Sequence, residues 1–240
     1  LGSGEITNAQ LLLAAARTGL PVILSTGMSS LGEVEAALAV LAFGYLGADV
    51  PPRSTAFRAA YESAAGRRRL AQRVTLLHCT TEYPAPLEDV NLLAMDVLQA
   101  AFGLPVGYSD HTQGIAVAIA AAARGATIIE KHVTLDRTLP GPDHQASLEP
   151  AELAQMVAAI GIVSRALGTG RKQAAVSECG NRDIARRSLV AACAIAAGET
   201  LSAANLTVRR PNNGITAMEY FDWLGRTARR DYLKDEPILP

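Results

Sequence analysis

Residues 105–134, PVGYSDHTQGIAVAIAAAARGATIIEKHVT, contain a short apolar run, an alanine-rich segment and a second short apolar run. The two runs, Pro105–Asp110 and Ala126–Thr134, are apolar almost throughout, which is typical of strands buried on both faces of a parallel sheet. The segment between them, Gly114–Arg124, is long enough for a helix. A strand, a helix and a strand in this order predict two parallel strands joined by a right-handed crossover. The stretch therefore favours an α/β fold.

The same alternation continues from Leu1 to about Leu167. Three more strands are expected at Leu1–Glu5, Val22–Gly27 and Val74–Thr80, and four more helices at Asn8–Thr18, Leu31–Leu46, Asp89–Phe102 and Pro150–Leu167. Five strands do not close an eight-stranded barrel. Either the sheet is open, or about three strands precede Leu1, and we favour the second. Because the chain starts without Met and inside a motif, we expect it to be a fragment of a longer protein.

One crossover is unusually long. Residues Gly44–Arg73 include the basic run Arg67–Arg69, and we expect a loop insertion that carries one extra helix, Ser54–Ala65. This insertion is either a solvated surface excursion or a contact surface for a partner. Farther along, Gly168–Arg182 is polar and contains glycines, so it is typical of a linker. After it the pattern predicts a compact module with short strands and many turns.

The bulk composition excludes several classes of protein. A net charge of −1 argues against binding to nucleic acid or to a membrane surface, since both normally require a basic excess. Three cysteines without a CxxC spacing fit a reducing compartment better than a disulfide framework. The longest apolar stretch, Ile115–Ala123, is too short to span a bilayer, and no signal-peptide pattern is present. We expect a cytoplasmic protein with no nucleic-acid or membrane partner.

The histidines suggest where the chemistry lies. All four follow short apolar runs: His78, His111, His132 and His144. Such positions at strand ends point to one polar site at one end of a parallel sheet. His111 and His132 are separated by one helix and one strand of similar length, so both should emerge at the same end of neighbouring strands.

Two imidazoles near carboxylates suit a divalent ion of intermediate hardness such as Mn²⁺, Fe²⁺ or Co²⁺. The carboxylates in question are Asp110, Glu130 and Asp143. With two protein nitrogens, coordination positions remain for substrate and water, and the metal would act as a Lewis acid. From spacing alone, a structural or hydrogen-bonding role for the two histidines is favoured over metal binding.

Hydroxyl groups gather at the same predicted strand ends, at Ser25, Thr26, Thr80, Thr81, Ser109 and Thr112. They are suitable phosphate donors, although each alone could be a helix cap. Asp143 could bind sugar hydroxyls or brace its loop. Cys79 is expected to be a small buried residue rather than a nucleophile, because no base is paired with it.

Several long motifs occur in one order along the chain: ILSTGMSSLGEVEAAL, LLHCTTEYPAPLEDVNL, LPVGYSDHTQGI, EKHVTLDRTLPGPDHQASLEP and LTVRRPNNGI. Together they resemble the sialic acid synthase family, which includes N-acetylneuraminate synthase and legionaminic acid synthase. The resemblance covers nearly the whole chain except residues 44–73. It implies the last five strands or so of a (β/α)₈ TIM barrel at 1–168, a linker at 169–185 and a small antifreeze-like SAF domain at 186–240.

The resemblance also implies a transferase that forms a carbon–carbon bond. Phosphoenolpyruvate would condense with N-acetylmannosamine, or a related 2-acetamido-mannose derivative, to give a sialic acid and phosphate. The alternative acceptor is the 2,4-diacetamido-2,4,6-trideoxymannose of legionaminate. The implied metal is Mn²⁺, with Mg²⁺ or Co²⁺ as alternatives, and its ligands would be His111 and His132.

The family's other site residues map onto this chain as well. The implied roles are phosphoenolpyruvate contacts at Ser25, Thr81 and Ser109, sugar contacts at Tyr83, Glu130 and Asp143, and a catalytic carboxylate at Glu130. The family is a homodimer in which the SAF domain of one subunit covers the partner's barrel. Its arginine, matching Arg210, would reach the N-acyl group of the sugar there.

The chain departs from the family pattern in four ways. The first barrel strands are absent, and with them a phosphate-binding lysine and a glutamate near the metal. Leu20 stands where some members have a phosphate-binding lysine, Thr81 replaces an asparagine of some members, and Asn212 replaces a glycine of the turn.

Two rival functions remain. One is a related barrel synthase that makes a shorter keto acid, which would lack the module at Arg187–Pro240. The other is a non-catalytic carbohydrate-binding protein on a degenerate barrel, against which His111, His132 and Asp143 count.

Overall fold

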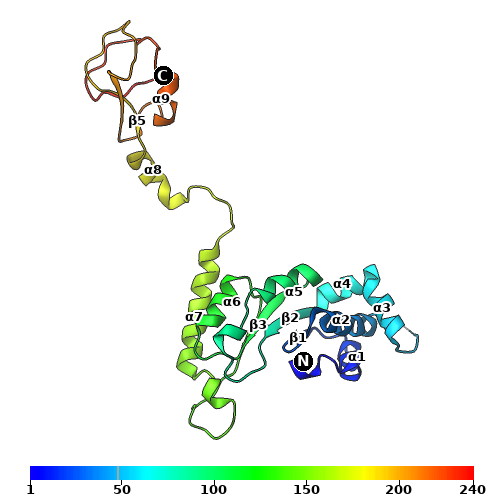
Figure 1. Cartoon of the computed structure of the whole chain (residues 1–240). Helices are drawn as coiled ribbons and strands as arrows, with labels where there is room; N and C mark the ends of the chain where they lie inside the picture. Colours follow the sequence, from blue (N-terminus) through cyan, green and yellow to red (C-terminus); the bar gives the residue numbers. More distant parts are fainter. Residues whose placement is uncertain (48) are drawn as a thin grey trace. The chain divides into compact units, whose positions relative to one another are not determined.

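The computed structural model describes residues 1–47 and 49–240. The chain divides into two units, Leu1–Thr169 and Gly170–Pro240, and each is described by itself. The first unit holds a parallel sheet with its helices, and the second holds the short strands of the C-terminal module (Figure 1).

Four parallel strands form the sheet of the first unit in the order of the sequence. They are β1 (Val22–Ser25), β2 (Val74–Cys79), β3 (Val106–Asp110) and β4 (Ile129–Lys131). Each strand pairs with the next strand of the sequence, and a crossover connects the two, as the alternating pattern predicts. Their carboxyl ends therefore lie along one edge of the sheet.

The crossovers are helical. The helices of the first unit are α1 (Ala9–Arg17), α2 (Leu31–Leu46), α3 (Ser54–Glu62), α4 (Ala64–Arg73), α5 (Ala94–Phe102), α6 (Ala116–Ala123) and α7 (Pro150–Leu167), with short 3₁₀ turns η1 (Ser3–Glu5), η2 (Leu87–Asp89) and η3 (His144–Ala146). The bounds of α2 and α7 coincide with the predicted ones. A capping box at Ser30 and Glu33 fixes the start of α2, and Pro150 occupies the first turn of α7.

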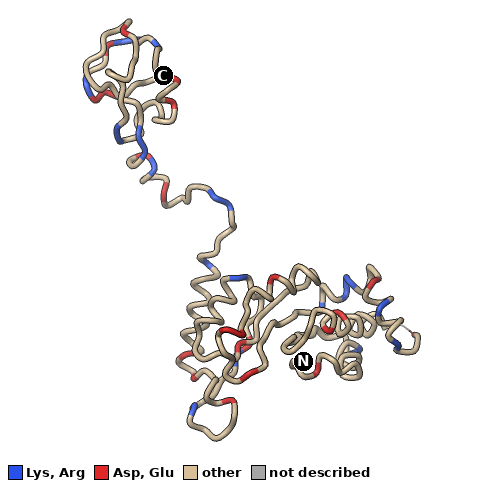
Figure 2. Tube along the Cα trace, in the orientation of Figure 1, with Lys and Arg blue, Asp and Glu red and all other residues tan. Residues whose placement is uncertain are grey.

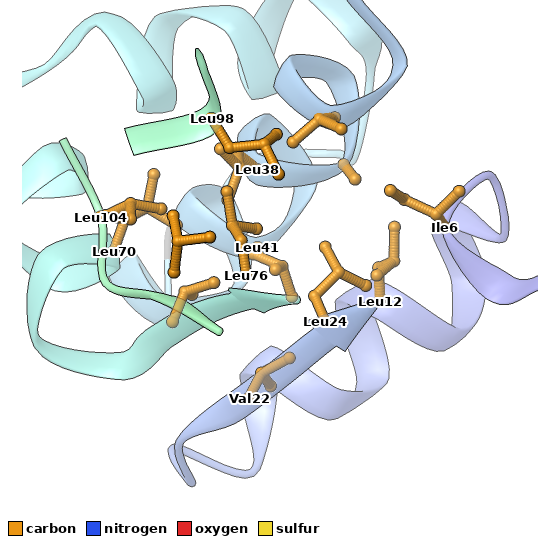
Figure 3. Close-up of a cluster of buried hydrophobic side chains, with 14 of the residues drawn as sticks. Ile6, Leu12, Val22, Leu24, Leu38, Leu41, Leu70, Leu76, Leu98 and Leu104 are labelled. Carbon is orange, nitrogen blue, oxygen red and sulfur yellow. The ribbon is translucent and has the colours of Figure 1, made fainter. Parts of the chain in front are cut away.

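The main core lies between one face of the sheet and these helices. Leu24 of β1 and Leu76 of β2 lie beside Leu38 and Leu41 of α2 (Figure 3). Val106 and Tyr108 extend the same layer on β3. Because side chains alternate along a strand, the odd-numbered residues of β1, β2 and β3 face away from the helix layer.

The predicted strand Leu1–Glu5 is wrong in all but its first residue. The backbone of Leu1 pairs with β1, since Ser25 N–H donates to Leu1 O at 3.0 Å, and the chain then turns into η1. Gly2 and Gly4 bring no side chain to a sheet and have low β propensity, which explains the early end. The described sheet therefore has four strands instead of five.

The long crossover holds two helices instead of the single one predicted at Ser54–Ala65. Ser63 has an extended backbone and ends α3, and its hydroxyl accepts a hydrogen bond from Gly66 N–H at 2.9 Å, which starts α4. α4 then runs directly into β2 and carries the basic run. Basic residues are spaced along this part of the chain (Figure 2). One of them, Arg67, lies over the ring of Tyr61 at 5.7 Å.

Two other predicted bounds need correction. The helix expected at Asp89–Phe102 begins only at Ala94, because Asn91 adopts a left-handed conformation with φ of 47° after η2. The strand expected at Ala126–Thr134 is reduced to the three residues of β4. Val133 makes a single further bridge to Leu148.

Among the described helices, α7 is long and apolar enough to cross a membrane by length and composition alone. In the structure it packs against α6, where Met156, Ala118 and Leu148 form a small buried cluster. It is therefore the outer helix of the last strand–helix unit.

The second unit begins with η4 (Val176–Glu178) and the short helix α8 (Cys179–Ala185), which lie inside the segment expected to be a linker. Its body is a two-stranded antiparallel ladder of β5 (Ser188–Ala191) and β6 (Leu206–Arg209), followed by η5 (Ala217–Glu219) and α9 (Tyr220–Trp223). Isolated bridges such as Val190–Pro237 and Ile195–Tyr232 close it around Leu189, Leu201 and Ile238.

Candidate active site

The sheet register brings two predicted site residues, Ser109 and Glu130, onto the face that points away from the helices, together with Cys79. Cys79 pairs with Ser109, and Ser109 pairs with Glu130, so these side chains form a row across β2, β3 and β4. His111 and His132 follow two residues after Ser109 and Glu130. The two-residue period of a strand directs them to the same face.

The two imidazoles lie close together. Their ring centroids are 5.4 Å apart and their planes are nearly perpendicular. His111 is buried, and its Nδ1 lies 2.7 Å from Thr80 O. Because a carbonyl oxygen can only accept, Nδ1 carries the hydrogen and Nε2 presents its lone pair. An orienting bond of this kind is typical of histidines that ligate metals.

The serine beside His111 does not occupy that lone pair. Ser109 Oγ donates to Glu130 Oε1 at 2.6 Å, and His111 Nε2 lies 3.4 Å from the same hydroxyl. The single hydroxyl hydrogen is committed to the carboxylate, so Ser109 has none to give to Nε2 of a neutral imidazole. The bond also holds Glu130 against β3, one strand from its own.

Tyr83 covers the histidine pair. Its ring centroid lies 4.2 Å from that of His111 and 5.4 Å from that of His132. Partial burial raises the pKa of the Tyr83 phenol, and electrostatic interaction with Cys79, Asp143 and Glu130 raises it further. The hydroxyl therefore stays protonated near neutral pH and can donate a hydrogen bond to a ligand.

A second group of polar atoms gathers around Gly27, at the ends of β1 and β2. Ser3 Oγ accepts from Gly27 N–H at 3.0 Å and lies 3.0 Å from Cys79 Sγ. Thr81 Oγ1 is buried without a hydrogen-bond partner among the described residues. Since buried hydroxyls are normally satisfied, this one is available to an incoming acceptor such as a phosphate or carboxylate oxygen. Ser25 is buried at the end of β1, beside this group in sequence.

Ser3 was missed by reasoning from the sequence. The hydroxyl groups considered there were those that follow predicted strands, and Ser3 was placed inside one. The signal was the SGE triplet, in which residues of low β propensity interrupt the expected run. Cys79 is free and buried, as the sequence predicts for a small buried residue.

Two histidines do not belong to the paired set. His78 lies within β2, and its Nε2 bonds to Val90 O at 2.8 Å on the helix side of the sheet. His144 lies in η3 and bonds through Nδ1 to Thr134 Oγ1 at 2.7 Å. The expectation of one site holding all four histidines is therefore wrong for His78, because strand alternation turns it away.

The three carboxylates that were expected near the metal lie in different places. Glu130 lies in the row described above. Asp110 points to the helix side and pairs with Lys131, so it is not available to the site. Asp143 is exposed, with Oδ2 3.9 Å from His132 Nδ1, beside a cavity of about 410 Å³ that the loop after β4 forms.

The donor set fits a divalent ion with open coordination positions. No group of three or more His, Cys, Asp and Glu side chains arranged to hold a metal exists within residues 1–47 and 49–240. The two facing imidazoles could supply two ligands, His111 through its Nε2, and would leave the other positions to substrate and water. Arg210 lies in the second unit, directly after β6.

Comparison with known proteins identifies the family of this chain. The NeuB family matches residues 1–172 and the SAF domain matches residues 186–240. The chain is 49% identical over 236 residues to the N,N'-diacetyllegionaminic acid synthase of Campylobacter jejuni, covering 98% of this chain and 64% of that protein. It is 36% identical to the N-acetylneuraminate-9-phosphate synthase of Mus musculus, covering 100% of this chain and 60% of that protein. The chain thus spans less than two thirds of either relative.

A solved structure supports the fold. The crystal structure of the N-acetylneuraminic acid synthetase of Leptospira borgpetersenii in complex with citrate superposes with a TM-score of 0.59 at 38% identity. The alignment covers 75% of this chain and 54% of that one. The predicted fold class, part of a TIM barrel followed by a SAF domain, is confirmed.

Proposed function

Because the chain belongs to the NeuB family, we propose that it condenses phosphoenolpyruvate with a 2-acetamido-mannose sugar to give a nonulosonic acid and phosphate. The observation that carries the proposal is the pair His111–His132, in which Thr80 O fixes the tautomer of His111. Glu130 and Tyr83 lie against this pair, and the open Thr81 hydroxyl lies on the neighbouring strand end. The related proteins are synthases of such acids, which supports the same reaction class here.

We assign the substrate contacts by chemistry. Phosphoenolpyruvate would be held by the hydroxyls of Ser25 and Thr81, and we add Ser3 to this group. Ser109 is the third hydroxyl that the resemblance implies, but its hydrogen is bonded to Glu130, so we give it the role of holding that carboxylate. The sugar would be held by Tyr83, Glu130 and Asp143. His111 and His132 would hold Mn²⁺, with Mg²⁺ or Co²⁺ as alternatives. When bound, such an ion supplies Lewis-acid polarisation of the open-chain aldehyde.

The protein residues then guide charge and protons. C3 of phosphoenolpyruvate bonds to the aldehyde carbon, and positive charge develops at C2. The Glu130 carboxylate, held by Ser109, stabilises that charge and accepts a proton from the water that adds at C2. The C2–O bond to the phosphate then breaks, and phosphate leaves with the proton of the new C2 hydroxyl, so that the keto group forms. The proton held by Glu130 passes to the oxygen of the former aldehyde, which becomes a hydroxyl. Tyr83 shields the site from bulk water.

Two acceptors are considered, N-acetylmannosamine and 2,4-diacetamido-2,4,6-trideoxymannose. The sequence alone placed N-acetylmannosamine first. The higher identity to a legionaminic acid synthase, 49% against 36% for the N-acetylneuraminate-9-phosphate synthase, now favours the diacetamido sugar.

We also propose a cytoplasmic homodimer in which the SAF domain of one subunit covers the partner's barrel and Arg210 reaches the N-acyl group. The three cysteines are free thiols, which suits a reducing compartment. The net charge of −1 gives no reason to expect nucleic acid as a partner.

The test is phosphate release by the full-length protein with Mn²⁺ and each sugar. His132→Ala should lower kcat/KM by at least about a hundredfold, because it removes a ligand of the ion. His78→Gln is the matched control, since it replaces an imidazole on the helix side and keeps a donor for Val90 O. Undiminished release by chelator-treated His132→Ala protein would contradict the assignment. No release with either sugar, in protein that still binds Mn²⁺, would point to another acceptor or to a non-catalytic barrel.

A further inference from the structure

A buried ion pair lies directly behind the two site histidines. Asp110 and Lys131 are cross-strand neighbours at the last register position of β3 and β4. Lys131 Nζ lies 3.0 Å from Asp110 Oδ2, and the two side chains are 2% and 0% exposed. Each residue immediately precedes a histidine, and both side chains point to the helix side while the histidines point to the site.

Asp110 and Lys131 bond to Thr112 as well as to each other, so their contacts involve the residues directly before and after His111. Asp110 Oδ1 accepts from the backbone N–H of Thr112 at 2.9 Å and from its hydroxyl at 2.7 Å. Lys131 Nζ also donates to Thr112 O. Lys131 therefore connects residues 110 and 112, which lie on either side of His111 in the sequence, to the end of β4, directly before His132.

This connection matters because the ladder here is short. β4 has three residues, and both histidines lie beyond its last register position. Their backbone carbonyls bond elsewhere, His111 O to Ala85 N–H and His132 O to Leu148 N–H, each at 2.9 Å. Within the described residues, two side-chain bonds connect β3 to β4. The Ser109–Glu130 hydrogen bond lies on the site face, and the Asp110–Lys131 ion pair lies on the helix face.

We propose that Asp110 and Lys131 are positioning residues that set the separation of the His111 and His132 imidazoles, and so the affinity of the site for its divalent ion. The proposal rests on the proposed function, because it assigns a role to the residues behind the histidine pair. A buried ion pair is weak evidence for stability, since an apolar pair often serves as well, whereas fixing a register is its better attested use. Neither side chain touches substrate, and both act through the histidines.

The test compares full-length proteins by Mn²⁺ titration and by the visible absorption of bound Co²⁺. The double variant Asp110→Asn/Lys131→Met removes both charges together and keeps an acceptor for Thr112 N–H, so no lone charge is buried. We expect wild-type secondary structure by circular dichroism, a Mn²⁺ Kd raised about 10- to 100-fold, and an altered Co²⁺ spectrum. Asp96→Asn is the control, since it breaks the half-exposed pair with Arg124 between α5 and α6 and should leave both readouts unchanged.

A folded double variant with wild-type Kd and spectrum would overturn the positioning role. If the double variant does not fold, Thr112→Val decides, because it removes one hydroxyl from the network and keeps the shape of the side chain. An unchanged Kd in Thr112→Val would then overturn the proposal, and a Kd raised several-fold would support it. Wild-type protein that binds no Mn²⁺ would instead overturn the proposed function, and the positioning role with it.

Discussion

Gly27 lies where three polar side chains meet, and a methyl group has no space there. A Cβ at this position would lie 2.3 Å from Thr81 Oγ1, 2.7 Å from Cys79 Sγ and 2.8 Å from Ser3 Oγ. Gly27→Ala should therefore displace the hydroxyls that we assign to phosphoenolpyruvate. We expect kcat/KM for phosphoenolpyruvate to fall on the order of 10- to 100-fold, with most of the change in KM.

The measurement is steady-state kinetics with each substrate varied in turn. Gly32→Ala is the control, because a Cβ at Gly32, in α2, meets no atom within 4 Å. Its kinetics should match those of the wild type. A Gly27→Ala enzyme with an unchanged KM for phosphoenolpyruvate would show that the substrate does not use this group of hydroxyls.

At the scale of elements, the loop after β4 carries Asp143 and is held by charged and polar bonds. Arg137 pairs with Glu152 of α7 and donates through Nε to Ser147 O at 3.0 Å. The hydrogen bond from Arg137, together with the backbone N–H of Glu149, lowers the pKa of Glu152 below its ordinary 4.5. The bonds from Thr138, first from its hydroxyl, lower the pKa of Asp136.

These lowered pKa values predict acid sensitivity of the loop. A carboxylate whose folded-state pKa is depressed contributes stability above its unfolded-state pKa and loses it as the pH falls through the folded value. We therefore expect hydrogen-exchange protection of residues 135–149, corrected for intrinsic rates, to hold down to about pH 5 and to fall at lower pH. Glu152→Gln should lower this protection already at neutral pH.

The matched control for the loop is Glu236→Gln, which weakens the comparable pair with Arg230 in the second unit. It should affect exchange near residue 236 and leave residues 135–149 unchanged. Equal protection of the loop in Glu152→Gln and in the wild type would show that the Arg137 pair does not hold it.

The helices and strands show how much of the fold can be predicted from the sequence. The bounds of α2 were predictable because Ser30, Glu33 and the left-handed Gly47 mark both ends with local bonds. The split at Ser63 was not, because Ser63 ends one helix and caps the next while the surrounding residues are all compatible with a continuous helix. β4 is short because only three of its residues pair with β3. This pairing is a tertiary contact, so it cannot be predicted from the sequence around β4.

Part of the candidate site could also be predicted from the sequence. The 21-residue interval between His111 and His132 indicated their meeting, because one helix and one strand return the chain to the same edge. The direction of His78 and the pairing of Asp110 with Lys131 depend on where each strand begins, since a shift of one residue turns every side chain to the other face.

The proposed dimer makes each site depend on two chains. His132 would come from one subunit and Arg210 from the other. A heterodimer of a His132→Ala chain and an Arg210→Ala chain would then contain one doubly impaired site and one intact site. If the SAF domain covers its own barrel instead, both sites would be impaired.

We therefore expect the heterodimer, purified through two different affinity tags, to recover about half of wild-type turnover at low sugar concentration. Each parent homodimer should be far less active under the same conditions. Arg209→Ala is the control partner for the Arg210 position, since Arg209 is engaged by Asp235 at 2.9 Å, and its homodimer should keep wild-type use of the sugar. Turnover of the heterodimer no higher than the mean of its two parents would place the covering domain on its own barrel, and Arg210 would then act within one chain.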